Sequence, residues 1–195
     1  MKVSFSRNTI LQYGLGLAMM ASLVLEMVWI RYWSLLFGTT VKATSLVFGG
    51  FLLGFGFGSY FFGKKSSQGF SAIARLLRHL TLASLILFFM LWGLKALWLN
   101  GFAGFRGILL FVAWLCLLYP SFLMGGFFPL CAKSMKKEDV KKTLSSLYTA
   151  DLVGAAVGVL LAGFILIPRW GLVLSYGFAI LVFFILSLFF GRIKD

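Results

Sequence analysis

Charge is scarce in this sequence, and acidic charge is scarcest. Only 12% of the 195 residues are charged, and 5 Asp or Glu stand against 18 Lys or Arg. Soluble domains carry roughly twice that share of charge, so the composition excludes an ordinary soluble domain. Cysteine and histidine are also few. Cys116, Cys131 and the single His79 show no CxxC or Cys/His spacing, so we predict no metal site, no disulfide and no cofactor.

Hydrophobic residues take the place of charge. They make up 61% of the sequence, with a mean hydropathy of +1.00, 23 Phe and 22 Gly. The net charge of +13 comes from Lys and Arg grouped in short stretches between apolar runs. That grouping is typical of loops on the cytoplasmic side of a membrane. We therefore expect the lipid bilayer, and not nucleic acid, to be the partner of these charges.

Six runs of the sequence reach the length of about 20 apolar residues that a spanning helix needs. They cover Ile10 to Trp33, Val41 to Phe62, Leu76 to Leu99, Ile108 to Cys131, Leu144 to Ile167 and Leu172 to Phe190. We predict an all-α fold, a polytopic bundle of six transmembrane helices that forms a single membrane domain over residues 1–195. The connections are short, so we expect consecutive helices to be antiparallel and adjacent.

The distribution of Lys and Arg predicts the orientation of the bundle. Four segments are basic: the one before the first run, the connections after the second and fourth runs, and the one after the sixth run. In that order they hold Lys2 and Arg7; Lys64, Lys65, Arg75 and Arg78; Lys133, Lys136, Lys137, Lys141 and Lys142; and Arg192 and Lys194. The alternate connections hold only Lys42, Arg106 and Arg169, with Arg31 and Lys95 near helix ends. By the positive-inside rule, both termini face the cytoplasm in a multi-pass protein of the cell (inner) membrane.

Glycine ridges predict where helices pack. Gly50, Gly54 and Gly58 recur every four residues in the second run, and Gly154 and Gly158 form a GxxxG pair in the fifth. Small residues let membrane helices approach closely, so we expect both helices to be central and tightly packed. The pattern leaves open whether these contacts lie within one chain or between two.

The fourth run contains the stretch YPSFLMGGFFP. Pro120 removes a backbone donor and is expected to kink the helix, and Pro129 is expected to end it. Gly125 and Gly126 add backbone freedom between them. Interrupted helices line binding cavities in transporters, but they also occur as packing kinks. Both interpretations stay open.

Two acidic residues lie inside apolar runs, where an ionisable group is costly and marks a candidate functional site. Glu26 is expected to meet another helix, while Arg31, about 140° away around the same helix, reaches the interface. Asp151 shares a helical face with the glycine pair of its run and should point into the bundle, with Tyr148 nearby. We predict a substrate-binding or proton pathway at Glu26, Arg31, Tyr148 and Asp151. A structural hydrogen-bond clamp at Asp151 is the alternative. Glu26 and Asp151 should differ in depth by roughly 15 Å.

Several stretches resemble the membrane portion of spermidine synthase-like membrane proteins. They are LVLEMVWIRYWSLLFGTT, FLLGFGFGSYFFGKK, PSFLMGGFFPL and LYTADLVGAAVGVLLAGFILIPRWG, in the same order and over nearly the whole chain. That membrane portion is similar to half of a major facilitator superfamily transporter, and it is usually joined to a cytoplasmic aminopropyltransferase-like domain. The Asp-Arg and Gly-Arg-Arg signature of the superfamily is missing here, so that likeness is partial.

The catalytic residues of aminopropyltransferases have no matching positions in this chain, and no nucleophile–base pair is visible. We therefore do not expect it to be an enzyme on its own. Two hypotheses remain, with the sequence silent on whether it is a fragment of a longer protein. One is a small-molecule binding or transport module, a homodimer or paired with another membrane protein, for which the family name suggests polyamines. The other is a membrane anchor or accessory subunit that docks a soluble aminopropyltransferase-like enzyme through the basic loop KSMKKEDVKK. That loop could equally be a simple topology determinant.

Overall fold

The computed structural model describes residues 6–37, 40–65, 69–99, 106–135 and 140–193, and within them it is built of helices with no strand. The elements are α1 (Arg7–Phe37), α2 (Thr40–Lys65), α3 (Phe70–Leu99), α4 (Arg106–Gly125), α5 (Phe127–Ser134), α6 (Val140–Leu161), the π-helical turn η2 (Ala162–Leu166) and α7 (Ile167–Arg192). The predicted all-α class is confirmed.

Five stretches of the described residues are long and apolar enough to span a membrane. They are Arg7–Leu35, Val41–Lys64, Phe70–Gly93, Trp114–Ser134 and Leu144–Arg192. Helices of this kind fit a membrane protein. The last stretch is 49 residues long, which as one straight helix would measure about 73 Å, more than twice the thickness of the hydrocarbon core.

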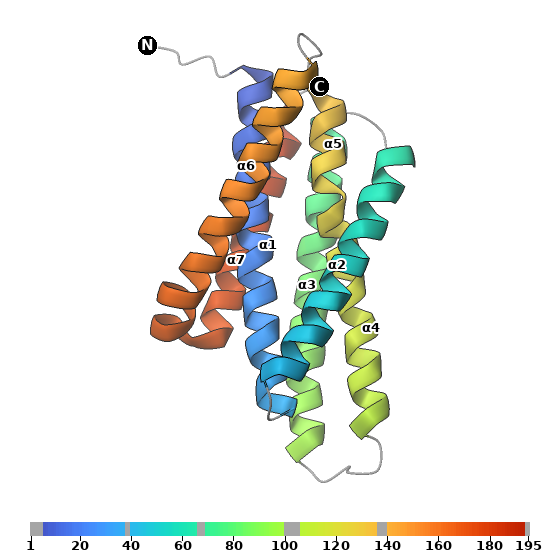
Figure 1. Ribbon diagram of the computed structural model, residues 1–195, viewed down its shortest axis with the longest axis vertical. Helices are drawn as coiled ribbons and strands as arrows, with labels where there is room; N and C mark the ends of the chain where they lie inside the picture. The colour runs from blue at the N-terminus through green and yellow to red at the C-terminus, as the bar shows by residue number, and fades with distance from the viewer. Residues whose placement is uncertain (1–5, 38–39, 66–68, 100–105, 136–139, 194–195) are drawn as a thin grey trace.

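This last stretch is not straight. Gly171 adopts φ 75° and ψ −179°, a conformation that interrupts the helix, and Figure 1 shows α6 and α7 running in opposite directions on either side of this turn. The contacts of α6 and α7 with α1 also show that these two helices run in opposite directions. Gly158 of α6 lies against Met20 of α1, in a pair of parallel helices, whereas Phe190 near the end of α7 lies against Gly14 near the start of α1.

The helices extend beyond the apolar runs that predicted them. Helix α3 begins at Phe70, so Arg75 and Arg78 lie on the helix and not in the connection before it. The same holds for Lys133 in α5 and Arg192 in α7. Charged side chains at helix ends can reach the interface, and the helix therefore continues after the apolar pattern stops.

The fourth run is interrupted at a different place from the one predicted. Pro120 lies inside α4 and the break occurs at Gly126, whose N–H bonds the Leu123 carbonyl at 3.0 Å. Pro129 does not end the helix. It occupies the first turn of α5, where a missing N–H leaves no helical hydrogen bond unmade.

The expectation that consecutive helices are neighbours holds only in part. Apart from α5, which continues in the direction of α4, consecutive helices are antiparallel in Figure 1. The most extensive contacts, however, join α1 to α6 and α2 to α4, which are parallel pairs. We call these two contacts the α1–α6 seam and the α2–α4 seam. Helix α1 is central and also contacts α2, α5 and α7.

Backbone contacts at glycine define both seams. A Cβ at Gly54 would lie 2.7 Å from the Ser121 Cβ and 2.8 Å from the Leu118 carbonyl oxygen, and one at Gly58 would collide with the Phe122 carbonyl. In the other seam, a Cβ at Gly154 or Gly158 would collide with the carbonyls of Gly16 and Met20, respectively. Gly50 lies against Trp114 and Leu117. The five predicted packing glycines therefore make contacts within one chain.

Candidate functional site

Glu26 is the most deeply buried acidic residue of the described chain. It lies on α1 with 2% of its surface exposed, and neither carboxylate oxygen has a hydrogen-bond partner among the described residues. The apolar neighbours that make α1 a membrane-type helix, such as Leu25 and Val28, supply no donors. A buried polar group without a partner is costly, and more so if it is charged. Glu26 is therefore a carboxyl group that the fold does not satisfy by itself.

A group of polar atoms surrounds the next turn of α1. The Trp29 indole approaches the Tyr176 hydroxyl of α7 without reaching hydrogen-bond geometry. The Tyr176 hydroxyl donates to the Ser84 carbonyl of α3 at 2.8 Å, and the Ser84 hydroxyl itself has no partner. Because Glu26 and Trp29 are three residues apart, they lie on the same side of α1. The Trp29 indole and the Ser84 hydroxyl, both without a partner among the described residues, thus lie on either side of Tyr176.

Sequence reasoning missed Trp29, Ser84 and Tyr176. Each is a single polar or aromatic residue in an apolar run, and such residues are frequent in membrane helices as simple packing or interfacial groups. Only the meeting of α1, α3 and α7 distinguishes these three, and that meeting depends on contacts between residues distant in the sequence.

Arg31 does not pair with Glu26. Its side chain is exposed, and its carbonyl accepts a hydrogen bond from the Ser34 hydroxyl at 2.7 Å. This is the position expected for an arginine near the end of a helix that reaches the interface.

Asp151 lies on α6 beside the α1–α6 seam. One of its carboxylate oxygens, Oδ1, is buried and finds no hydrogen-bond partner in the part of the chain that the structure describes, although the residue as a whole is only half-buried. It interacts electrostatically with Cys131 of α5. Tyr148, one turn earlier, is exposed and packs edge-on against Phe128 of α5, with 6.4 Å between the ring centroids. Asp151 therefore lies at a junction of α1, α5 and α6.

The structure does not bring the two acidic residues into one site. Ala150 contacts Gly16, so Asp151 lies at about the level of Gly16 on α1. Glu26 is ten residues further along this helix, a rise of about 15 Å. The two carboxyl groups therefore occupy two separate positions at different depths of the bundle.

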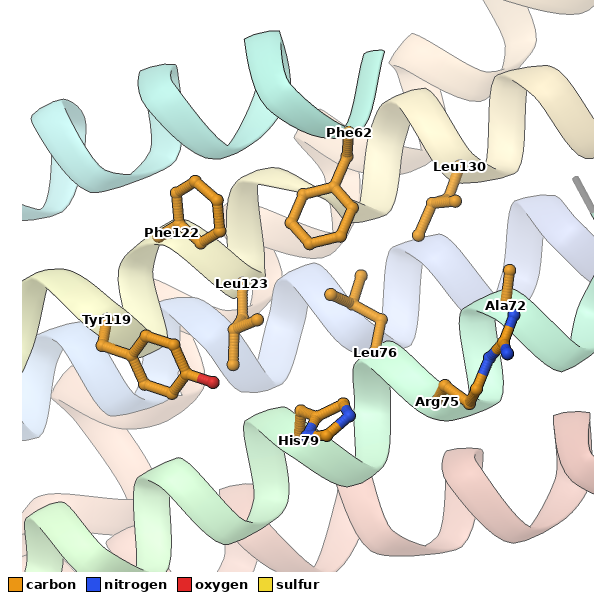
Figure 2. A pocket seen from close by; sticks show the side chains of 9 residues that line it. All are labelled: Phe62, Ala72, Arg75, Leu76, His79, Tyr119, Phe122, Leu123 and Leu130. Carbon is orange, nitrogen blue, oxygen red and sulfur yellow. The ribbon is translucent and has the colours of Figure 1, made fainter. Parts of the chain in front are cut away.

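A cavity of about 370 Å³ lies elsewhere, between α3 and the α2–α4 seam. Its lining residues are Phe62, Ala72, Arg75, Leu76, His79, Tyr119, Phe122, Leu123 and Leu130. Figure 2 shows Arg75, His79 and the Tyr119 hydroxyl along one side, and Phe62, Phe122 and Leu130 along the other. Sequence reasoning missed this cavity. The spacing of Arg75 and His79, four residues apart on one helical face, was the available signal.

Among the described residues, no group of three or more His, Cys, Asp or Glu could hold a metal ion. Comparison of the chain with protein-family models, curated proteins and solved structures gives no match. What the chain does must therefore be inferred from its own side chains.

Proposed function

We propose that this chain is a six-helix membrane domain that binds or transports a small molecule, with Glu26 and Asp151 as carboxyl groups that take up a proton or a cationic amine. The observation that carries the proposal is the Glu26 carboxyl group, buried inside the bundle with no partner for either oxygen. An ionisable residue within a membrane span is by default a candidate for a substrate path or proton relay.

The turn at Gly171 supports six crossings over five. If residues 144–192 crossed once, the two ends of the chain would lie on opposite sides of the membrane. The contact between Gly14 and Phe190 instead supports two crossings, because it brings the start of α1 and the end of α7 together. Both termini then face the cytoplasm of the cell (inner) membrane, as the positive-inside rule requires.

The topology can be tested with reporters that are active on one side of the membrane only. A reporter inserted at Gly171 should be external, and one fused after Arg192 should be cytoplasmic. An external reporter after Arg192 would mean five crossings.

The contact pattern also supports the likeness to half of a major facilitator transporter. Such a half contains two inverted repeats of three helices. If α4 and α5 count as one pass, the six passes are α1, α2, α3, α4 with α5, α6 and α7. When the first three passes are exchanged in order with the last three, the α1–α6 seam becomes the α2–α4 seam. The same exchange leaves the α3–α7 contact in place. A half-transporter is completed by a second half, which here is a second copy of this chain or another membrane protein.

Transport can be tested with the purified protein in liposomes that carry a pH-sensitive dye. We expect spermidine uptake, or proton flux driven by a pH gradient, to fall at least tenfold in Glu26→Gln and in Asp151→Asn. Ser22→Ala is the matched control, because Ser22 is buried on the same helix and its hydroxyl bonds only the Ala18 carbonyl, at 2.9 Å. Unchanged flux in a folded Glu26→Gln protein would remove Glu26 from any pathway.

The second candidate is a membrane anchor or accessory subunit for a separate aminopropyltransferase-like enzyme. Exposed Lys64 near the end of α2, Arg78 in the first part of α3 and Arg192 at the end of α7 favour this candidate, because these parts of the three helices lie toward one end of the bundle in Figure 1. Lys133, from the proposed docking loop, instead bonds the Phe62 carbonyl at 3.1 Å, and residues 136–139 lie outside the described residues. Co-expression with such an enzyme and co-purification would support docking. If the enzyme does not co-purify with the membrane protein, that result would count against docking.

A further inference from the structure

We propose that the cavity between α3 and the α2–α4 seam binds the phosphate of an anionic glycerophospholipid, with Arg75 as the main ligand and His79 as an additional hydrogen-bonding group. The placement of this cavity in the cytoplasmic leaflet rests on the proposed topology. The binding chemistry does not, since it depends only on the residues that line the cavity.

The lining of the cavity is amphipathic. Arg75, His79 and Tyr119 are exposed, so the cavity opens to the surroundings of the bundle along its polar side. The remaining lining residues are apolar and come from all of the surrounding helices. None of the described residues that line the cavity is acidic. This arrangement fits a ligand with an anionic head and an apolar body, and it disfavours a cationic one.

The depth of the polar groups matches the interface of a bilayer. Helix α3 is 30 residues long, about 45 Å, which equals the thickness of a bilayer with its headgroups. Arg75 and His79 follow Phe70, the first residue of α3, by about 8 Å and 14 Å along the axis. Arg75 therefore lies at headgroup level and His79 just below it, while Phe122, Leu123 and Tyr119, which is further from this end along α4, lie at the depth of the acyl chains.

The chemistry of Arg75 and His79 favours phosphate. The guanidinium of arginine matches phosphate oxygens in a bidentate geometry. A histidine N–H can donate to one of the remaining oxygens. A lipid from the same leaflet can reach this site sideways, without leaving the membrane, and its acyl chains can cover Phe62 and Phe122.

The test uses the full chain in nanodiscs of phosphatidylcholine with increasing phosphatidylglycerol, and native mass spectrometry counts the lipids that stay bound after release. We expect the wild type to retain phosphatidylglycerol and Arg75→Gln to reduce that retention at least tenfold. Arg78→Gln is the matched control, because Arg78 is exposed on the same helix but does not line the cavity. It should change retention less than twofold. Equal losses in the two variants would reduce the effect to general surface charge and overturn the proposal.

A second variant protects the test against misfolding of Arg75→Gln. Ala72→Phe fills the cavity and keeps every charge, so it should also abolish retention. Retention by Ala72→Phe, or equal retention of phosphatidylcholine by the wild type, would overturn the lipid site. Displacement of the lipid by millimolar inorganic phosphate would show a free-phosphate site instead. Retention in Glu26→Gln should match the wild type, so failure of the transport proposal and failure of this one are distinguishable.

Discussion

The α1–α6 seam and the α2–α4 seam pack in the same way but differ in polarity. In each, two glycines four residues apart on one helix lie against carbonyl groups of a parallel helix. Gly154 and Gly158 contact Gly16 and Met20, as Gly54 and Gly58 contact Leu118 and Phe122. The two seams are equivalent solutions to one packing problem.

The polar residues break this equivalence. Asp151 lies three residues before Gly154, and the residue three before Gly54 is Phe51. Glu26 lies six residues after Met20, and the residue six after Phe122 is Phe128. The corresponding positions beside the α2–α4 seam thus carry phenylalanine, Phe51 on α2 and Phe128 on α5, where Phe128 packs against Tyr148 of α6. Packing therefore does not require the acids, which strengthens the argument that Glu26 and Asp151 are kept for another purpose.

The largest effect is expected from adding one methyl group to a seam glycine. Gly58→Ala should destabilise the protein by at least about 3 kcal/mol, because the new Cβ collides with the Phe122 backbone and neither helix can give way cheaply. Gly158→Ala should behave alike if the seams are equivalent, because its Cβ would collide with the Met20 backbone. Unfolding of the purified protein in mixed detergent micelles measures both.

Gly56 and Gly163 are the matched controls, because a Cβ at either position meets nothing within 4 Å. Gly56→Ala and Gly163→Ala should be neutral or stabilising by up to about 1 kcal/mol, since alanine is the better helix former. If Gly58→Ala and Gly56→Ala changed the free energy of unfolding in the same direction, the α2–α4 seam would not be the tight contact described above.

The sequence predicted the elements of this fold better than their arrangement. Apolar runs identify membrane helices, and the glycine spacing identifies the packed faces of α2 and α6, because both are local properties of the chain. The pairing of α1 with α6 and of α2 with α4 depends on contacts between distant residues, so the rule that short loops make neighbours adjacent was incomplete. Local structure also misled at Pro129, where the interruption at Gly126 turns an expected helix end into a helix start.

The candidate site divides in the same way. Glu26 and Asp151 could be selected from the sequence because an acid in an apolar run stands out, and the rise per residue gave their separation. The Tyr176–Ser84 contact and the cavity at Arg75 could not be predicted from the sequence, because each is formed by residues from different helices. A tyrosine or an arginine near a helix end is ordinary until its neighbours are known.

A second prediction sharpens the difference in polarity between the seams. Glu26→Met should stabilise the protein by about 2 kcal/mol while abolishing transport, because it replaces a buried, unpartnered carboxyl with an apolar group of similar size. Phe128→Met on α5 is the comparison and should be neutral or destabilising. A clear loss of stability in Glu26→Met would mean that Glu26 is a structural clamp, contrary to the proposed function.

The smallest effects are expected at two connections, the one between α2 and α3 and the one between α6 and α7. The exchange of the first three passes with the last three relates these two connections to each other. Gly69 precedes α3 with φ 117°, and Gly171 precedes the main part of α7 with φ 75°. Residues other than glycine rarely adopt such φ angles. Gly69→Ala and Gly171→Ala should therefore each destabilise the protein by about 1 kcal/mol in the same unfolding assay.

Gly177→Ala on α7 is the control for this pair, because its Cβ meets nothing within 4 Å and its φ is not positive. Between the two connections, Gly69 should be the more sensitive. It is buried, and its N–H donates to the Ser134 hydroxyl at 3.0 Å, whereas Gly171 is exposed. A larger loss at Gly171 than at Gly69 would contradict this ranking. It would also show that the turn between α6 and α7 is the more constrained of the two connections.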